Sequence, residues 1–368
     1  NGATVLMSTH RLHEAQLLID HVLMMYRGQK VLDQPLEESL QEAFDGTWRI
    51  RATGDTGVRA AAELRVKAGD RIAPAVSERT RLGAGIEGID MTAPLEGEEI
   101  SAIERAFDRY LVLRFRGQPL DAGQLAAFAR QFGDLQPHVQ RKFQHPDEAN
   151  VVEMRSFDKY GEFDLAGASR GATERLRDGW HSDLAYDRVP AKATLLHAIE
   201  VPSRGGNTCF ANACRVYAAL PEDLKRRIAG LRAEFTYGGN TRNKATNLAA
   251  TSLDRHGRDN TTAVHPMVCV HPASRRPALY ANPLVTMRVV GMAAASSDDL
   301  LDELFDWLDR PEFRWEHEWR VGDTLMWENR GGVMHCGRLD YPRNQRRHFI
   351  RTTVRGQPIE AHVAPQAQ

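Results

Sequence analysis

The chain has 368 residues, of which 42% are hydrophobic and 26% charged, an ordinary composition for a folded protein that excludes wholesale disorder. Its length is more than twice the ~150 residues of a typical domain, which predicts two domains or one large domain with an appendage. Lys and Arg number 48 against 49 Asp and Glu, and the resulting formal charge of −1 argues against a dedicated nucleic-acid binder.

Cysteine usage and hydropathy bear on the compartment of the protein. The four cysteines form no C-x-x-C pair, so they indicate neither a zinc ribbon nor a disulfide framework. No run of 18 apolar residues is present, so we expect no membrane span. Without a signal-peptide pattern, these features predict a cytoplasmic protein.

The first 75 residues have a pattern of their own. Their predicted elements are, in chain order, a strand at 3–8, a helix at 12–19, a strand at 21–26, a turn at 27–29 with a further strand from Val31, a short helix at 36–44 and a strand at 63–66. The periodicity dissolves at 69–77. We therefore place a domain boundary there, between residues 1–75 and 76–368.

The remainder of the chain predicts mainly short strands. These are expected at 83–90, 111–115, 193–201, 207–212, 262–271, 278–282, 324–328, 332–335 and 348–354. Helices are expected at 98–110, after a cap at Asp121, and at 221–233 and 298–309. Many short strands with Gly and Pro turns predict a mainly β fold, a sandwich or barrel with flanking helices.

A His-x-Asp pair stands in the segment 180–183 (Trp-His-Ser-Asp). On a strand, residues i and i+2 point to the same side, so His181 and Asp183 can present a nitrogen and an oxygen to one point. His335 offers a third ligand. Two histidines and one carboxylate with the opposite face open are typical of non-haem Fe(II) oxygenases. H-x-D alone is common, and a surface or capping pair is the alternative.

Two arginines near the C-terminus lie four residues apart on an otherwise apolar, strand-like run. This even spacing puts Arg347 and Arg351 on one face of a strand. Inward-facing guanidiniums are costly unless they meet anions. The alternative is a solvated basic edge over residues 343–351.

Six motifs, in the same order along the chain, resemble those of a known enzyme family. The motifs are Leu-Gly-Ala-Gly-Ile-Glu-Gly-Ile-Asp at 82–90, Gln-Phe-Gly-Asp-Leu at 131–135, Trp-His-Ser-Asp at 180–183, Gly-Gly-Asn-Thr at 205–208, Trp-Glu-Asn-Arg with Met-His at 327–335, and Gln-Arg-Arg with Arg-Thr-Thr at 345–353. Over about residues 79–358 the chain resembles the taurine dioxygenase / 2,4-dichlorophenoxyacetate dioxygenase family, which depends on Fe(II) and 2-oxoglutarate. The resemblance implies a double-stranded β-helix, or jelly roll, as the core.

The resemblance also implies a metal centre and a cosubstrate site. His181, Asp183 and His335 match the Fe(II) ligands of the family. Arg347 matches the residue that pairs with the distal carboxylate of 2-oxoglutarate, helped by the Thr208 hydroxyl. Family halogenases lack the carboxylate ligand, so an intact Asp183 favours oxygenation.

Substrate contacts follow less directly from the resemblance. Arg351 and His138 match positions that contact the anionic end of the substrate in taurine enzymes. The spacing from the last histidine ligand to the arginines is one residue longer than usual, so Arg346 is an alternative to Arg347. Arg141 replaces a family tyrosine, which argues against taurine itself.

The resemblance implies hydroxylation of a small, anionic organic substrate, with O2 consumed and succinate and CO2 released. A homo-oligomer, dimer or tetramer, is also implied. Instead of substrate, a protein carboxylate such as Glu328 or Asp340 is an alternative partner for Arg351. A zinc hydrolase using the same three ligands is a rival function, but it has no obvious role for Thr208 and the arginines.

Residues 1–45 resemble the C-terminal end of an ABC-transporter ATPase. His10 matches the switch histidine of that family, although an ordinary strand-end histidine is the simpler interpretation. The sequence contains no G-x-x-x-x-G-K-[ST] loop, so this segment cannot bind ATP alone. Either the chain is a fragment of a fusion between a transporter subunit and an oxygenase, or the join is an accident of gene prediction.

Other suggestive patterns have simpler interpretations. The G-x-S-x-G match at 167–171 follows a loop rather than the buried strand that a nucleophile elbow requires. His197, His265 and His271 lie in extended runs and are expected to be packed rather than ligating. The alternating tryptophans at 315, 319 and 327 are expected in the core.

Overall fold

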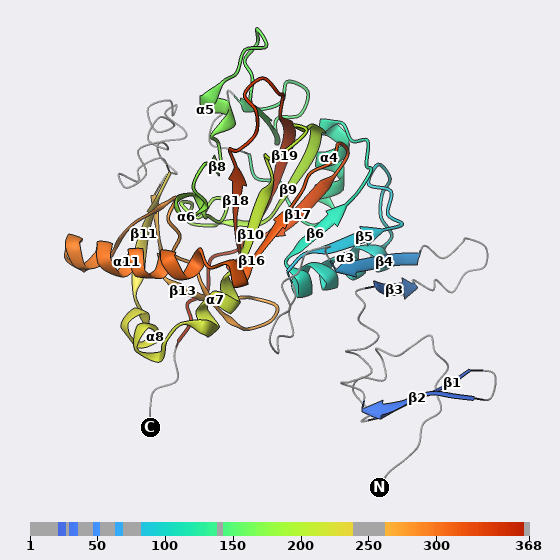
Figure 1. Cartoon of the computed structure of the whole chain (residues 1–368), viewed down its shortest axis with the longest axis horizontal. Coiled ribbons are helices and arrows are strands. Elements are labelled where there is room, and N and C mark those ends of the chain that lie inside the picture. The colour runs from blue at the N-terminus through green and yellow to red at the C-terminus, as the bar shows by residue number, and fades with distance from the viewer. Residues whose placement is uncertain are drawn as a thin grey trace.

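A computed structural model describes the backbone of four strands between residues 21 and 68, and residues 82–137, 143–237 and 262–363 (Figure 1). The predicted strand at 3–8 and helices at 12–19 and 36–44 lie outside the described residues, as does His10. In the part of the chain that the structure describes, no helix has the length and apolar character needed to cross a membrane.

Two sheets make up most of the fold. The larger sheet has the order β3 (Thr47–Arg51), β4 (Glu63–Ala68), β5 (Ala84–Glu87), β6 (Val112–Phe115), β17 (Thr324–Glu328), β9 (Ala191–Glu200), β19 (His348–Arg355) and β7 (Val151–Arg155). The smaller sheet has the order β16 (Arg314–His317), β10 (Thr208–Asn212), β18 (Val333–Arg338) and β8 (Ala172–Thr173). Neighbouring strands in both sheets are mostly antiparallel.

Three shorter pairings complete the described strands. They are β12 (Thr262–Pro266) with β11 (Arg232–Thr236) and β15 (Thr286–Val289), β13 (Val268–Val270) with β14 (Pro277–Leu279), and β1 (His21–Tyr26) with β2 (Gln29–Pro35). The expected strands at 21–26 and 63–66 are therefore confirmed. So are most of those expected after residue 82, although the run at 278–282 ends earlier, at Leu279.

Helices flank the sheets. Helices α3 (Gly97–Tyr110) and α4 (Ala122–Arg130) pack on one face of the larger sheet (Figure 1). Helices α7 (Ala213–Ala219), α8 (Glu222–Ile228) and α11 (Ala294–Leu308) belong to a second cluster with β11, β14 and β15. Two one-turn helices, α5 (Leu165–Ala168) and α6 (Leu176–Gly179), and a 3-10 turn (Pro311–Phe313) lie in connections. Mixed sheets with flanking helices confirm the mainly β class.

The expected cap of α4 is present. Asp121 Oδ1 accepts a hydrogen bond from the Gln124 amide at 2.8 Å, and the Gln124 side chain accepts one from the Asp121 amide at 2.9 Å. This reciprocal capping box satisfies two amides that would otherwise lack partners at the start of the helix. Leu125 and Phe128 then face the core, as their helical spacing predicts.

An aromatic layer lies between the two sheets. Phe210 of β10 stacks on Trp315 of β16, and both belong to a buried cluster with Trp327 of β17 and Phe349 of β19. The expected core positions of Trp315, Trp319 and Trp327 are confirmed. These aromatic side chains, which come from strands of both sheets, therefore form one buried hydrophobic cluster.

One helix ends earlier than the sequence predicts. The helix expected at 221–233 stops at Ile228, and β11 begins at Arg232. Gly230 adopts a φ of +70°, a left-handed conformation that ends a helix at little cost. Ala233 and Phe235 are then buried on alternate positions, which is a strand period. The strands that were not predicted from the sequence are β3, β7, β8, β11, β15 and β16, and the helices that were not predicted are α5, α6 and α7.

The larger sheet continues past the predicted domain boundary. Strand β4 pairs with β5, with Val66 opposite Ile86, and β3 pairs with β4. These two strands precede residue 76, yet they extend the edge of the sheet. The division into residues 1–75 and 76–368 stays a prediction.

Candidate active site

The three predicted metal ligands come together. His335 lies on β18, and its backbone exchanges hydrogen bonds with that of His181 at 2.8 and 3.0 Å. The ligand atoms of His181, Asp183 and His335 all lie within 4.8 Å of one another, and all three side chains are buried. Among the described residues, no other group of three His, Cys, Asp or Glu side chains converges in this way.

The reason for this convergence differs from the predicted one. His181 and Asp183 are not on a strand: His181 forms an isolated bridge and Asp183 begins a turn. The predicted strand over residues 181–183 is therefore wrong. The bridge to His335 and the turn bring the carboxylate to the same point.

The nitrogen atoms of the two histidines are suited to ligation. His181 Nδ1 lies 2.8 Å from the Gly179 carbonyl, to which it can only donate, and this leaves the Nε2 lone pair facing Asp183. His335 Nε2 lies 3.5 Å from Asp183 Oδ2, and its ring packs on Trp327. Burial lowers the pKa of both histidines, which favours the neutral form that binds a metal.

Asp183 supplies the negative charge of the cluster. Burial alone would raise the pKa of this carboxyl, but the Arg351 guanidinium and the two histidines hold it well below its usual range. Thr194 Oγ1 donates a hydrogen bond to Asp183 Oδ2 at 2.6 Å. One carboxylate and two neutral imidazoles, all converging, form a donor set that fits a divalent transition metal.

A hydrogen-bond chain fixes the position of that carboxylate. Asn329 Nδ2 donates to Thr194 Oγ1 at 2.9 Å, which leaves the Thr194 hydroxyl proton directed at Asp183. Asn329 Oδ1 accepts a hydrogen bond from the Asp183 amide at 3.0 Å. Neither Thr194 nor Asn329 had a role predicted from the sequence, although Asn329 lies inside one of the motifs.

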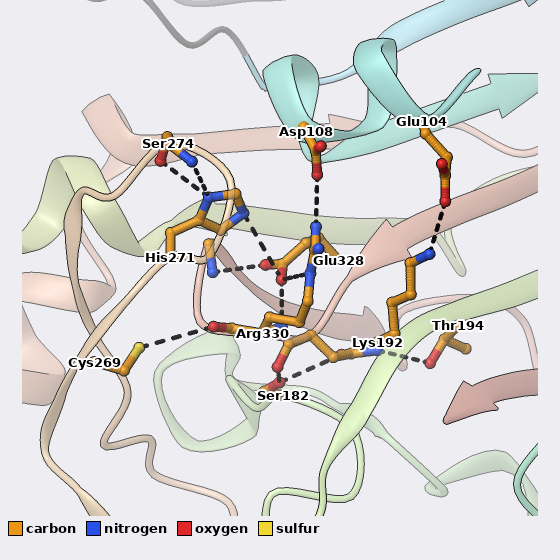
Figure 2. A network of polar contacts seen from close by, with 12 residues as sticks. Glu104, Asp108, Ser182, Lys192, Thr194, Cys269, His271, Ser274, Glu328 and Arg330 are labelled. Atoms are coloured by element: carbon orange, nitrogen blue, oxygen red, sulfur yellow. Dashed lines mark hydrogen bonds and ion pairs between the residues drawn. The ribbon is translucent and has the colours of Figure 1, made fainter. Parts of the chain in front are cut away.

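Glu328 and Arg330, the residues on either side of Asn329, anchor the turn that carries it (Figure 2). Glu328 is fully buried, and its carboxylate accepts hydrogen bonds from Arg330 Nε at 2.8 Å and from the Gly332 amide at 2.7 Å. Arg330 Nη2 in turn donates to Asp108 of α3 at 2.8 Å, as Figure 2 shows. The connection between β17 and β18 is therefore tied to α3, and it positions both Asn329 and His335.

Arg347 immediately precedes β19 and is buried. Its Nε donates to the Gly206 carbonyl at 3.2 Å, and its guanidinium lies 4.1 Å from the centre of the Phe349 ring. It forms no ion pair with any described residue, and burial lowers its pKa to about 10. At Gly206, whose φ is +68°, a Cβ would lie 3.3 Å from Arg347 Cδ, so glycine allows the close approach.

The neighbouring arginine has a different environment. Arg346 Nε pairs with Glu200 Oε2 at 2.7 Å, and about half of its side chain is exposed. Its guanidinium stacks on Phe157. Of the two arginines that the sequence left open, Arg347 alone is buried without a carboxylate among the described residues.

Thr208 begins β10 in the smaller sheet. In the register of β10 and β18, Thr208 is opposite Gly337 and Phe210 is opposite His335. Trp319 Nε1 donates a hydrogen bond to Thr208 Oγ1 at 3.0 Å. Thr208 is thus buried two residues along the ladder from a candidate ligand.

Arg351 lies on β19, and its Nη2 is 2.8 Å from Asp183 Oδ1. The two protein carboxylates suggested as its partners are engaged elsewhere. Glu328 binds Arg330, and Asp340 binds Arg338 at 2.7 Å and the Gly206 amide. Arg351 therefore does pair with a protein carboxylate, which was the alternative to a substrate anion, but that carboxylate is Asp183. Glu328 and Asp340 are not its partners, because the turns that carry them use these carboxylates locally.

The remaining site predictions have mixed outcomes. His138 and Arg141 lie outside the described residues. His197 is buried against the Thr324 hydroxyl at 2.9 Å, and His265 Nε2 is 2.8 Å from the Asp187 carbonyl. These two histidines are packed, as expected, and stand apart from the three-residue cluster.

Comparison with known proteins gives a consistent result. The family model "Taurine catabolism dioxygenase TauD, TfdA family" matches residues 73–353. The chain is 36% identical over 276 residues to the alpha-ketoglutarate-dependent 2,4-dichlorophenoxyacetate dioxygenase of Cupriavidus pinatubonensis, covering 74% of this chain and 93% of that protein. It is 29% identical over 282 residues to the alpha-ketoglutarate-dependent sulfate ester dioxygenase of Pseudomonas putida, covering 75% and 87% of the two chains.

Solved structures show the same relationship. A taurine dioxygenase from Burkholderia xenovorans superimposes with a TM-score of 0.61 and 26% identity, over 78% of this chain and 92% of that chain. AAD-2 in complex with Mn(II) and N-oxalylglycine superimposes with a TM-score of 0.63 and 27% identity, over 78% and 99% of the two chains.

Proposed function

The chain belongs to the TauD, TfdA family and is an Fe(II)- and 2-oxoglutarate-dependent dioxygenase, and from this premise we propose the residues that perform its chemistry. His181, Asp183 and His335 hold the Fe(II). The observation that carries this proposal is the convergence of their ligand atoms within 4.8 Å in a buried site. The bound metal supplies the oxygen-activating step, in which 2-oxoglutarate is oxidatively decarboxylated to succinate and CO2.

We assign the distal carboxylate of 2-oxoglutarate to Arg347. This buried guanidinium has no carboxylate among the described residues, and a buried cation without an anion is costly. Thr208 supports the same end of the cosubstrate through its hydroxyl. A zinc hydrolase using the three ligands would leave Arg347 without an anion, and this argues against that alternative.

The substrate is a small organic anion that becomes hydroxylated. Arg351 lies beside the candidate metal centre, at 2.8 Å from Asp183, so its positive charge borders the space where substrate must approach. Relatives of the chain are named for 2,4-dichlorophenoxyacetate and for sulfate esters, both of which are anions. His138 stays a proposed substrate contact.

We further propose a core fold, a location and an assembly for the protein. The larger and smaller sheets, with the aromatic layer between them, form a double-stranded β-helix within a catalytic domain at 76–368. The protein acts in the cytoplasm, and the four buried free thiols support this location. A homo-oligomer is proposed from the family resemblance alone.

The proposed function is tested with the full chain purified without oxygen. Succinate formation should require both Fe(II) and 2-oxoglutarate, and it should increase with one member of a screen of sulfonates, sulfate esters, aryloxyacids and amino-acid derivatives. A weak visible charge-transfer band should develop when Fe(II) and 2-oxoglutarate are both present.

Asp183→Ala tests the ligand assignment directly. Because two ligands hold an ion poorly, turnover should fall by roughly 100-fold or more and metal affinity should fall with it. Asp299→Ala, on the exposed face of α11, is the matched control and should behave as wild type. Full turnover in Asp183→Ala would overturn the assignment.

A further inference from the structure

The segment that precedes β8 passes directly over the candidate metal centre. At Gly171 a Cβ would lie 3.5 Å from His181 Nε2, the atom left free for a metal. The Gly171 carbonyl accepts a hydrogen bond from the Gly337 amide of β18 at 2.8 Å, which fixes the segment beside His335. Arg170 is therefore the residue next to this contact, at the edge of the active site.

The guanidinium of Arg170 has protein contacts for some of its donors but not for all of them. Its Nη2 donates to the Glu153 carbonyl at 2.8 Å, and its Cζ lies 3.8 Å from the centre of the Phe143 ring. Its Nη1 is buried and has no hydrogen-bond partner. No carboxylate of the described residues forms an ion pair with it, so Arg170 is a partly buried cation whose buried Nη1 donor is unused.

Arg170 shares its surroundings with Arg351. Glu153, which anchors Arg170, follows Val152, and Val152 is opposite Arg351 in the register of β7 and β19. Both guanidiniums act electrostatically on the Tyr237 phenol, whose ring contacts Tyr186 at 4.9 Å between centroids. Both cations therefore lie near the same phenol, and Arg351 also contacts the Asp183 carboxylate.

Arg351 and Arg170 differ in whether a protein carboxylate neutralises their charge. Arg351 is paired with Asp183, whereas Arg170 has no protein anion among the described residues. In this respect Arg170 resembles Arg347, the proposed cosubstrate anchor. Burial lowers the pKa of both Arg170 and Arg347 to about 10, which leaves both charged at neutral pH.

We propose that Arg170 is a specificity-determining residue that donates, through Nη1, to the anionic group of the prime substrate alongside Arg351. This inference rests on the proposed function and deepens it. The substrate class is an organic oxyanion with at least two free oxygens, one for each guanidinium, as in a carboxylate, a sulfonate or a sulfate ester. A neutral amide of the same shape leaves Arg170 unpaired and is rejected.

The test measures binding to the full-length protein loaded with Fe(II) and 2-oxoglutarate under anaerobic conditions, by isothermal titration. The probes are 2,4-dichlorophenoxyacetate, hexyl sulfate and inorganic sulfate, and the probe with the highest wild-type affinity is carried forward. Arg170→Gln should weaken its binding by roughly tenfold or more, the loss of one charge-assisted contact. Arg170→Lys, which keeps the cation, should recover part of that affinity.

Two controls separate a charge role from a structural one. Arg175→Gln changes a solvent-exposed arginine five residues away, and it should bind the probe as the wild type does. 2,4-Dichlorophenoxyacetamide, the neutral analogue, should bind wild type and Arg170→Gln equally weakly. Thermal unfolding and 2-oxoglutarate affinity of each variant show whether the segment over the metal centre is intact.

Three binding results would count against a substrate contact by Arg170. Wild-type affinity of Arg170→Gln for the probe would overturn it, and so would failure of every probe to bind the wild type. A variant that binds 2-oxoglutarate as poorly as it binds the probe would show that Arg170 only supports the fold. The proposed function fails separately, if the wild type forms no Fe(II)-dependent succinate.

Discussion

The two sheets that enclose the candidate site contribute different kinds of groups. The smaller sheet carries neutral ones: His335 on β18, with His181 bridged to it, and the Thr208 hydroxyl on β10. The larger sheet carries the charged arginines, since Arg351 lies on β19 and Arg347 directly precedes it. The two histidine ligands are thus grouped with the smaller sheet and the two arginines with the larger one, while Asp183 lies on a turn.

Burial lowers the pKa of groups in both sets, but the consequence differs between them. Burial lowers the pKa of His335 well below its usual value, and this favours the neutral imidazole that a metal requires. Burial also lowers the pKa of Arg347, but only to about 10, so the guanidinium keeps its charge at neutral pH and needs an anion. Burial therefore favours the neutral histidine ligand on the smaller sheet. It leaves the arginine beside the larger sheet charged and in need of an anion.

The largest expected effects come from the arginines of the larger sheet. Arg347→Ala should raise the KM for 2-oxoglutarate by roughly 100-fold, since a bidentate charge-assisted contact contributes about 1.5–3 kcal/mol. Arg351→Ala should instead raise the KM for the prime substrate by tenfold or more, as a rough expectation from the same contact energy. Steady-state kinetics with each substrate varied in turn measures both effects.

Arg346→Ala is the matched control for this pair. Because its side chain is half exposed and pairs with Glu200, both KM values should change little. If Arg347→Ala and Arg351→Ala affected both substrates equally, the arginines would act as one structural cluster. The division into a cosubstrate anion site and a substrate anion site would then be abandoned.

A smaller effect, on metal affinity, should come from changing Thr194, which hydrogen-bonds the proposed ligand Asp183. Thr194 is on β9 of the larger sheet, yet its hydroxyl orients Asp183. Thr194→Val removes that hydrogen bond and should weaken Mn(II) binding by roughly tenfold, the lower end of the effect of changing groups that orient ligands. Equilibrium dialysis of the apoprotein measures this affinity.

Two further variants sharpen that result. Thr194→Ser keeps the hydroxyl and should restore most of the affinity, whereas Thr236→Val, a change of the same kind on β11, should leave it unchanged. Undiminished Mn(II) affinity in Thr194→Val would show that Asp183 is positioned without this hydrogen bond.

The sequence predicted the strands and ligands better than it predicted the connections. The three ligands and Arg347 lie in motifs, and the strands have a period of two that burial enforces. Thr194 and Arg170 could not be found in this way, because their roles depend on contacts distant in sequence. The Thr194 hydroxyl matters only once Asn329 and Asp183 surround it. The local sequence pattern likewise could not identify Asp183 as the partner of Arg351. A turn, and not the expected strand, places the Asp183 carboxylate beside that guanidinium.

The smallest effect on turnover is expected from removing residues 1–75. This change deletes β3 and β4 from one edge of the larger sheet, while Arg351 and Thr194 lie on β19 and β9, beyond β5, β6 and β17. Succinate formation should therefore stay within about twofold of the full chain, because mutations without shared partners act independently. The smaller sheet and its ligands should be unaffected.

Stability and solubility should respond more than turnover does. Deleting β4 leaves the β5 edge unpaired, and an exposed strand edge promotes association with other chains. A variant that starts at residue 45 keeps β3 and β4 and is the matched control for the loss of residues 1–44 alone. Light scattering, thermal unfolding and succinate formation are compared for the two truncations and the full chain. A truncation at residue 76 that is monomeric and folded, yet inactive, would place the first 75 residues within the catalytic unit, because the edge strands would then be needed to hold the charged side of the site in place.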